Sequence, residues 1–140
     1  MKILLAVDGS HVTKRMLSYI AAHDELLGPK NQFCVLTVVT PVPTHAARFL
    51  ERKVLDDYYR EEGEKVLQPI QAFLAQQNWT VTYSNVTGHP GETIASMADA
   101  EHFDLVVMGA HGHSSVGNVL LGSVATGVLS RCEVPVLLIR

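Results

Sequence analysis

The sequence has few cysteines, little charge and no long apolar run. Among its 140 residues, 2 are cysteines and 18% are charged. Cys34 and Cys132 show no CxxC or Cys/His spacing, so the pattern favours two buried, reduced thiols in a cytoplasmic protein over a disulfide framework or a zinc site. No stretch approaches the roughly 20 apolar residues of a membrane-spanning helix. The apolar run near the N-terminus is broken by Asp8 and lacks a small-residue cleavage site, so we expect no signal peptide.

The sequence also has fewer basic residues than acidic ones. The chain has 11 Lys and Arg against 14 Asp and Glu, which gives a formal net charge of −3. Nucleic acids and anionic membranes are bound by basic surfaces, so the charge balance argues against both classes of partner. Apolar residues make up 47% of the sequence. This composition is typical of a globular protein, and the length predicts a single domain over residues 1–140.

Short apolar runs alternate with segments of helical periodicity along the chain. Alternating strands and helices predict an α/β fold in which helices cover both faces of a doubly wound, mostly parallel sheet. We expect Ser10 to be the N-cap of the first helix, and Gly63 and Pro69 to break or kink the long second helical segment. The strands are predicted at residues 2–7, 33–39, 80–87, 104–109 and 134–140, and the helices at 12–27, 46–77, 92–100 and 123–131.

Residues 106–127 combine many glycines with a complete lack of charge. The segment holds five of the ten glycines and no Asp, Glu, Lys or Arg. Glycine has no Cβ to obstruct a ligand, and Gly122 and Ser123 open a predicted helix whose first N–H groups are unpaired. Such a turn is typical of a phosphate or nucleotide site. A flexible structural loop is the alternative interpretation.

Two well-known phosphate-binding loops do not match this segment. Residues 117–124, GNVLLGSV, fit the Gly-x4-Gly frame of a P-loop but have Ser123 where the P-loop lysine must be. A Rossmann loop would need G-x-G-x-x-G after the first strand. That position holds AVDGSHVT, which has a single glycine.

A third pattern, Gly-x2-Gly-x9-Gly-Ser, is present in MGAHGHSSVGNVLLGS. It resembles the nucleotide loop of the universal stress protein family. Further segments are similar to other parts of that family, namely ILLAVDGS, VLTVVTPVP, TGHPGETI and EVPVLLIR, so the resemblance covers essentially the whole chain. It implies a five-stranded parallel sheet of order 3-2-1-4-5, the adenine nucleotide alpha hydrolase-like architecture. It also implies a homodimer in which the last strands pair.

The resemblance further implies an ATP site, with AMP or ADP as possible ligands and Mg²⁺ or Mn²⁺ held with the phosphates. Asp8 is expected near the ribose and phosphates as a metal ligand, and the backbone around Val38 is expected to face the adenine. The alternative role for Asp8 is a cap on the first helix. The remaining cradle around the nucleotide is expected to be formed by Met108, Gly109, Gly112, Gly122, Ser123 and Val124.

His111 and His113 depart from the pattern of the resembled family, whose loops often carry a basic residue such as Arg in this stretch. A neutral histidine offers no charge, and histidine ordinarily titrates near pH 6.5. We therefore count both histidines among the binding residues and expect ATP to bind more tightly at about pH 6 than at about pH 8. A His-x-His metal pair is the alternative, although no third ligand is evident nearby.

Three functions remain open at this point. The first is a cytoplasmic ATP-binding stress-response or signalling module that acts through nucleotide-dependent contacts with a second copy or a protein partner. The second is a slow ATP hydrolase or nucleotidyl-transferring enzyme, and the third is a dimeric interaction protein with a vestigial pocket. Hydrolysis needs a water-positioning base and charge stabilisation at the phosphates. Residues 105–132 contain no carboxylate and no Lys or Arg before Arg131, which favours the binding module.

Overall fold

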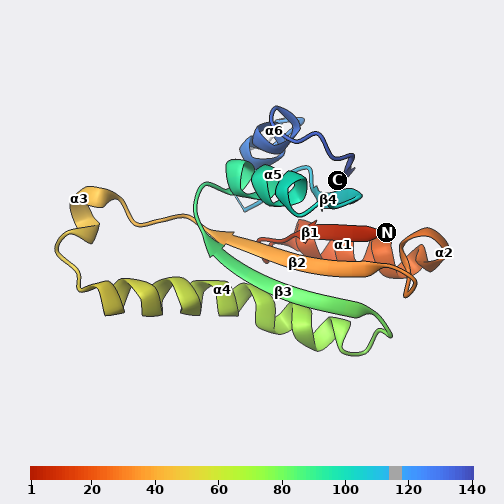
Figure 1. The fold of residues 1–140 in the computed structure, drawn as a ribbon, viewed down its shortest axis with the longest axis horizontal. Helices are drawn as coiled ribbons and strands as arrows, with labels where there is room; N and C mark the ends of the chain where they lie inside the picture. Colours follow the sequence, from red (N-terminus) through yellow and green to blue (C-terminus); the bar gives the residue numbers. More distant parts are fainter. Residues whose placement is uncertain (114–117) are drawn as a thin grey trace.

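The structure, a computed structural model, describes residues 1–113 and 118–140. Its centre is a parallel sheet of order β3-β2-β1-β4-β5 (Figure 1). The predicted fold class and strand order are confirmed, because every strand pairs in parallel with its neighbours. The strands are β1 (Lys2–Ala6), β2 (Gln32–Val39), β3 (Thr80–Thr87), β4 (Leu105–Gly109) and β5 (Val136–Ile139).

Helices cover both faces of the sheet. Parallel strands need a crossover between them, and here the crossovers place α1 and α4 on one face and α5 and α6 on the other (Figure 1). No helix within the described ranges is both long and apolar enough to cross a membrane. The helices are α1 (His11–Ala22), α2 (Asp24–Leu27), α3 (Thr44–Ala47), α4 (Arg52–Leu74), α5 (Pro90–Ala100) and α6 (Ser123–Leu129).

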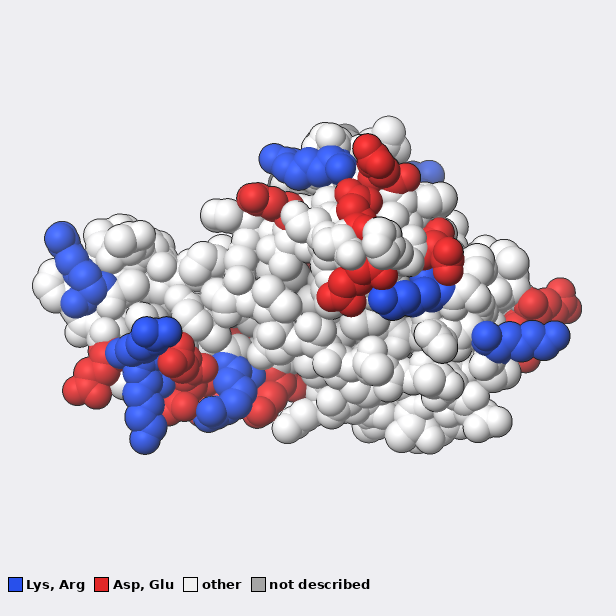
Figure 2. All heavy atoms as spheres, viewed as in Figure 1, with Lys and Arg blue, Asp and Glu red and all other residues white. Residues whose placement is uncertain are grey.

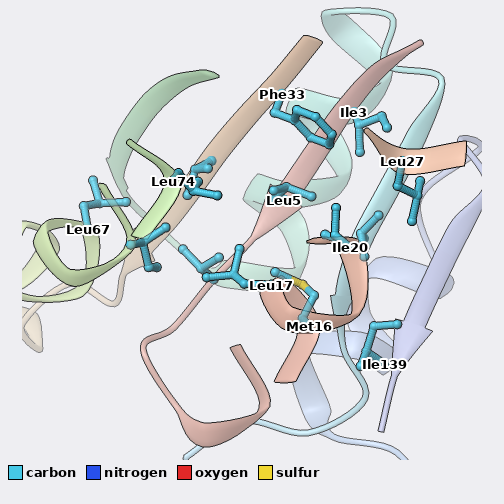
Figure 3. Close-up of a cluster of buried hydrophobic side chains, with 14 residues drawn as sticks. Ile3, Leu5, Met16, Leu17, Ile20, Leu27, Phe33, Leu67, Leu74 and Ile139 are labelled. Atoms are coloured by element: carbon cyan, nitrogen blue, oxygen red, sulfur yellow. The ribbon is translucent and has the colours of Figure 1, made fainter. Parts of the chain in front are cut away.

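Successive residues of β1 contribute to two separate cores. Ile3 and Leu5 pack among side chains of α1 and α4, as Figure 3 shows. Leu4 and Ala6 pack on the other face, among side chains of α5 and α6. A strand that is covered on both faces needs apolar residues at every position. This explains why β1 has a continuous apolar run rather than an alternating pattern.

The helix α4 differs from the prediction in both its start and its continuity. It begins at Arg52 rather than near residue 46, and it runs unbroken through Gly63 and Pro69. The side of α4 that carries Pro69 is exposed. The carbonyl of Lys65, which loses its intrahelical donor to the proline ring, can therefore be hydrated. The prediction of a break was wrong because the proline faces water.

Gly63 is accommodated in α4 by a contact with the neighbouring strand. The Asn85 side chain of β3 donates from Nδ2 to the carbonyl oxygens of Tyr59 at 3.2 Å and Arg60 at 3.5 Å. A Cβ atom on Gly63 would collide with the Asn85 amide group. The glycine thus allows close packing of the helix on β3, and it does not end the helix.

The first predicted helix is interrupted at His23. The helix α1 ends at Ala22 and the short helix α2 follows, so the predicted span of 12–27 is divided in two. The Nδ1 atom of His23 lies 2.8 Å from the carbonyl oxygen of Tyr19. The backbone N–H of His23 donates instead to Ile20 at 3.1 Å. The side chain therefore takes the acceptor that a continuing helix would use.

Ser10 is the N-cap residue of α1, as predicted, but its side chain does not make the expected cap. Its hydroxyl forms no hydrogen bond to the first turn. The Oγ atom is buried without a partner among the described residues. The turn before α1 is held by another side chain, which belongs to the site described below.

The two cysteines are free thiols: Cys34 is buried and Cys132 is half-buried. Burial raises the pKa of both thiols above the ordinary value. They therefore stay protonated near neutral pH and are poor nucleophiles.

Candidate functional site

A cavity lies at the carboxyl ends of β1 and β4. Its volume is about 430 Å³, which is typical of sites for small molecules. The strand β1 lies in the middle of the sheet. The strands β2 and β3 follow it toward one edge, and β4 and β5 follow it toward the other. The cavity therefore lies at the switch point of the sheet, where open α/β sheets bind their ligands.

All ten residues predicted for the site line this one cavity. The pairing of β1 with β4 is what brings the two halves of the site together, because Ala6 lies directly beside Met108 in the sheet. Asp8 follows β1, and the glycine-rich segment follows β4. The ten residues are Asp8, Val38, Met108, Gly109, His111, Gly112, His113, Gly122, Ser123 and Val124. The same glycine-rich segment contains Ser114 and Ser115, whose hydroxyls we expect to add donors to a phosphate site, and both lie outside the described residues.

Ten further lining residues were missed from the sequence. Thr13 lies in the first turn of α1, Thr40 directly follows β2, and Pro90 begins α5. All three lie just beyond the carboxyl end of a strand, and this position was the available signal. The other seven are small or apolar and look like core residues, namely Ala6, Val7, Leu36, Ile94, Ala110, Val119 and Ala125.

Asp8 uses one carboxylate oxygen within the protein. Oδ1 accepts hydrogen bonds from the Ser10 N–H at 2.9 Å and from the Thr13 hydroxyl at 3.0 Å. The backbone N–H of Asp8 in turn donates to Thr13 Oγ1 at 3.2 Å. This oxygen secures the start of α1, as the alternative capping role predicted. Oδ2 has no hydrogen-bond partner among the described residues, and it faces Gly112.

The surroundings of Asp8 keep its carboxylate ionised. Burial by itself would raise the pKa of Asp8, but hydrogen bonds from Ser10 and Thr13 act in the opposite direction. The nearby His113 also favours the charged form, and the pKa of Asp8 is lowered overall. At neutral pH the free Oδ2 therefore presents negative charge at the cavity, which suits a bound cation.

The loop glycines are required by contacts within the chain itself. A Cβ atom on Gly112 would lie 2.5 Å from Asp8 Oδ2. One on Gly122 would lie 3.1 Å from the carbonyl oxygen of Ala110, and the Gly122 N–H already donates to that oxygen at 2.7 Å. The glycines thus let the loop close tightly on Asp8 and on the end of β4. They shape the cavity wall as well as leaving space in front of it.

The start of α6 supplies donors to the cavity. The N–H of Gly122 is occupied by Ala110, but helix geometry leaves the N–H groups of Ser123 and Val124 without an intrahelical acceptor. Both residues line the cavity. The wall on this side therefore offers two backbone donors and the Ser123 hydroxyl.

The two loop histidines bind backbone carbonyls. Nε2 of His113 lies 2.7 Å from the carbonyl oxygen of Asp8, and Nε2 of His111 contacts the carbonyl oxygen of Val119. A carbonyl oxygen can only accept, so Nε2 carries the proton in both rings. A neutral ring then has an unprotonated Nδ1 and no second N–H to offer. Either histidine gains a donor for an anion only when it is protonated.

The described residues offer few protein ligands for a metal ion. Within residues 1–113 and 118–140, no three His, Cys, Asp or Glu side chains are placed to hold one together. The free Oδ2 of Asp8 is a single hard oxygen ligand. This fits Mg²⁺, which proteins commonly bind through one or two carboxylates while water and phosphate oxygens complete the shell.

The fold and the cavity define a doubly wound α/β protein with a ligand-sized site at its switch point. The sequence profile of the universal stress protein family matches residues 1–140. A universal stress protein of Thermus aquaticus, named for its place in the QAH/OAS sulfhydrylase 3′ region, is 32% identical over 138 residues, which cover 99% of this chain and 97% of that protein. The chain belongs to the universal stress protein family.

Solved structures share the fold. Protein MJ0577, from Methanocaldococcus jannaschii, has a TM-score of 0.82 at 27% identity, with 99% of this chain and 94% of that chain covered. An Arabidopsis thaliana universal stress protein with AMP bound has a TM-score of 0.70 at 16% identity, with 99% and 90% covered. A universal stress protein in complex with cAMP has a TM-score of 0.62 at 23% identity, with 100% and 96% covered.

Proposed function

We propose that this protein is a cytoplasmic adenine-nucleotide-binding module of stress response or signalling, in a single domain over residues 1–140. The observation that carries the proposal is the convergence of Asp8, the glycine loop and the start of α6 on one cavity of about 430 Å³. The family members described with AMP and with cAMP support an adenine nucleotide as the class of ligand. For this chain we propose ATP, with AMP or ADP as further ligands.

The lining residues suggest how the nucleotide would be held. The N–H groups of Ser123 and Val124 would donate to phosphate oxygens. The ionised Asp8 would bind Mg²⁺ or Mn²⁺ through Oδ2, and the phosphates would supply further oxygen ligands. Val38 and Met108 lie on the apolar side of the cavity, where the adenine ring and the ribose would pack. The bound metal would supply positive charge that the described lining residues lack.

We propose a binding role rather than efficient hydrolysis. Enzymes of phosphoryl transfer position a water molecule and stabilise the charge that develops on the phosphates. Asp8 is the one carboxylate among the described lining residues, and no Lys or Arg belongs to that set. One oxygen of Asp8 is already engaged by Ser10 and Thr13. Slow hydrolysis is the second candidate, because a metal beside Asp8 could polarise a phosphate.

The binding of nucleotide would change the contacts that this protein makes with a second copy or with a partner protein. The strand β5 lies at one edge of the sheet, beside β4. An unpaired strand edge can add a strand from another chain, so we propose a homodimer through β5.

The test is to release and identify nucleotide from the purified protein. Heat denaturation followed by absorbance and mass measurements should yield ATP, and titration calorimetry of the emptied protein with ATP and Mg²⁺ should show one site per chain. ADP together with measurable turnover would favour the slow enzyme. No released nucleotide and no heat of binding would refute the nucleotide site and favour an interaction protein with a vestigial pocket.

A further inference from the structure

The first half of α4 extends beyond the rest of the fold. The buried residues of this helix all lie at or after residue 63. Asn85 of β3 binds the carbonyls of Tyr59 and Arg60, so the seven helical residues before Tyr59 project, by roughly 10 Å at about 1.5 Å per residue. Figure 1 shows α3 and this part of α4 lying past the ends of the strands. We define residues 44–62 as the arm. The N–H of Val42 donates to the Tyr59 hydroxyl at 3.0 Å and fixes the base of the arm.

The arm carries a row of exposed apolar side chains. Phe49 is 81% exposed, Leu50 45%, Val54 50% and Tyr58 44%. Val54 and Tyr58 are four residues apart on α4 and therefore lie on the same side of the helix. A helical segment of this length is marginal in water unless an apolar face is packed. A contiguous group of large apolar side chains is also typical of an interaction surface.

The charges along the arm alternate in blocks of opposite sign. Residues 48–53 contain three cations and one carboxylate, and residues 56–62 contain four carboxylates and one cation. Figure 2 shows these Lys, Arg, Asp and Glu side chains gathered over α3 and the first half of α4. Two arms in antiparallel order would place the basic block of each against the acidic block of the other. The arm is thus complementary in charge to a second copy of itself.

We propose that the arm is a self-association surface that pairs with the arm of a second copy around a two-fold axis near Leu55. In this register Val54 lies between Val54 and Tyr58 of the second copy, so the apolar rows pack together. Lys53 lies opposite Asp57 of the second copy. Within one chain Asp57 pairs with Arg60 at 3.1 Å, whereas Lys53 has no ion-pair partner among the described residues.

The arm interface is distinct from pairing through β5 and does not depend on nucleotide. The β3 strand, on which α4 packs, lies at the sheet edge opposite β5. A molecule that uses both surfaces would form dimers of dimers. Two short arms make a contact below about 1,200 Å², the class of weak and transient interfaces. The association is therefore expected to appear as protein concentration rises.

The first test compares Val54→Asp with the matched control Gln71→Asp, which changes an exposed position in the second half of the same helix. Sedimentation velocity of the full chain, from low micromolar to near-millimolar concentration, should show at least a tenfold weaker association step for Val54→Asp and no change for Gln71→Asp. Far-ultraviolet circular dichroism and ATP titration should be unchanged in both variants. Equal association of the wild type and Val54→Asp would overturn the proposal.

The second test uses charge reversal to examine the register. Lys53→Glu and Asp57→Lys each place like charges opposite one another in a symmetric pair, so each variant alone should associate more weakly. A mixture of the two restores opposite charges at both sites. Native mass spectrometry of the mixture should show mixed pairs in excess over pairs of either variant. A statistical distribution of pairs would overturn the proposed register.

Discussion

Two segments of this protein reach beyond the carboxyl ends of the strands, and they are built from opposite kinds of residue. The first segment, the cavity loop, is described at residues 109–113 and 118–123, where it has three glycines and no charged side chain. The arm, residues 44–62, has nine charged side chains and no glycine. Residues without large side chains let backbone groups approach a small ligand. Large apolar and charged side chains instead cover area and suit a protein surface.

Among the variants that test this difference between the cavity loop and the arm, Gly122→Val is expected to have the largest effect on ATP affinity. The new side chain would meet the Ala110 carbonyl and the His111 backbone at 3.1 and 3.3 Å, which is closer than ordinary contact, so the backbone of the loop would have to shift. We expect the affinity for ATP to fall by at least tenfold and the free energy of unfolding to fall by about 1–3 kcal/mol. Calorimetric titration and urea unfolding measure both quantities. Ser130→Val, at an exposed position just after α6, is the control and should leave the affinity for ATP unchanged.

An unchanged ATP affinity in Gly122→Val would mean that the cavity loop does not hold the ligand. It would therefore contradict the contrast drawn between the cavity loop and the arm. A loss of stability without a loss of affinity per folded molecule would have the same meaning.

The next effect concerns the metal that Asp8 is proposed to bind. Asp8→Asn removes the negative charge but keeps the hydrogen-bond acceptor for Ser10 and Thr13. Hydrogen bonds and contacts to charged groups contribute about 1.5–3 kcal/mol, so we expect roughly a tenfold or greater loss of ATP affinity in the presence of Mg²⁺. The control is the same titration with a chelator, in which the variant and the wild type should converge. A loss of equal size with and without Mg²⁺ would contradict the metal role.

The pH dependence of ATP binding is expected to be smaller. Each loop histidine already uses its Nε2 proton on a backbone carbonyl, so only the protonated ring can donate Nδ1–H to a phosphate. Phosphate favours the cationic ring, so affinity is expected to rise as the solution becomes more acidic. We expect ATP to bind several-fold more tightly at about pH 6 than at about pH 8. The double variant His111→Gln, His113→Gln should bind almost equally at both values, and a flat response of the wild type would refute the idea.

The smallest effect is on stability in acid. The pKa of Asp8 is lowered in the folded protein, so its contribution to stability is complete above the ordinary value of about 3.9 and is lost as pH falls through the folded value. Because Asp8 is partly exposed, solvent screening keeps this contribution below about 1 kcal/mol. Urea unfolding between about pH 2 and pH 5 should show a slightly shallower loss of stability for Asp8→Asn than for the wild type. A steeper loss of stability for Asp8→Asn than for the wild type would contradict a lowered pKa of Asp8 in the folded protein.

The sequence was sufficient to predict β1, β2 and β4 because a strand that is buried on both faces favours an apolar residue at each position. The run at residues 33–39 matches β2 to within one residue at its start. The course of α4 could not be predicted, because the effect of Pro69 depends on which side of the helix faces water. The role of Gly63 depends on Asn85, which lies on a strand more than twenty residues away. Both facts arise from packing that the local sequence does not contain.

The cavity was predictable to a similar degree. Asp8 and the loop glycines occur in a recognisable pattern, and the structure brings them together. Thr40 and Pro90 also line the cavity, but they become neighbours of the site only because their strands end at the same edge of the sheet. The sequence also could not distinguish a glycine that leaves room for a ligand from one that leaves room for another part of the chain. For Gly122 the Ala110 carbonyl occupies that room.

The position of β1 in the middle of the sheet has a consequence for how the protein is made. Chains emerge from the ribosome with the N-terminus first, so β1 can pair with β2 well before β4 exists. Asp8 is thus in place early, whereas the wall opposite it arrives only after residue 123 has been synthesised. A nucleotide that needs both walls would bind finished chains and leave interrupted ones empty, and so would stabilise only molecules whose synthesis has passed this point.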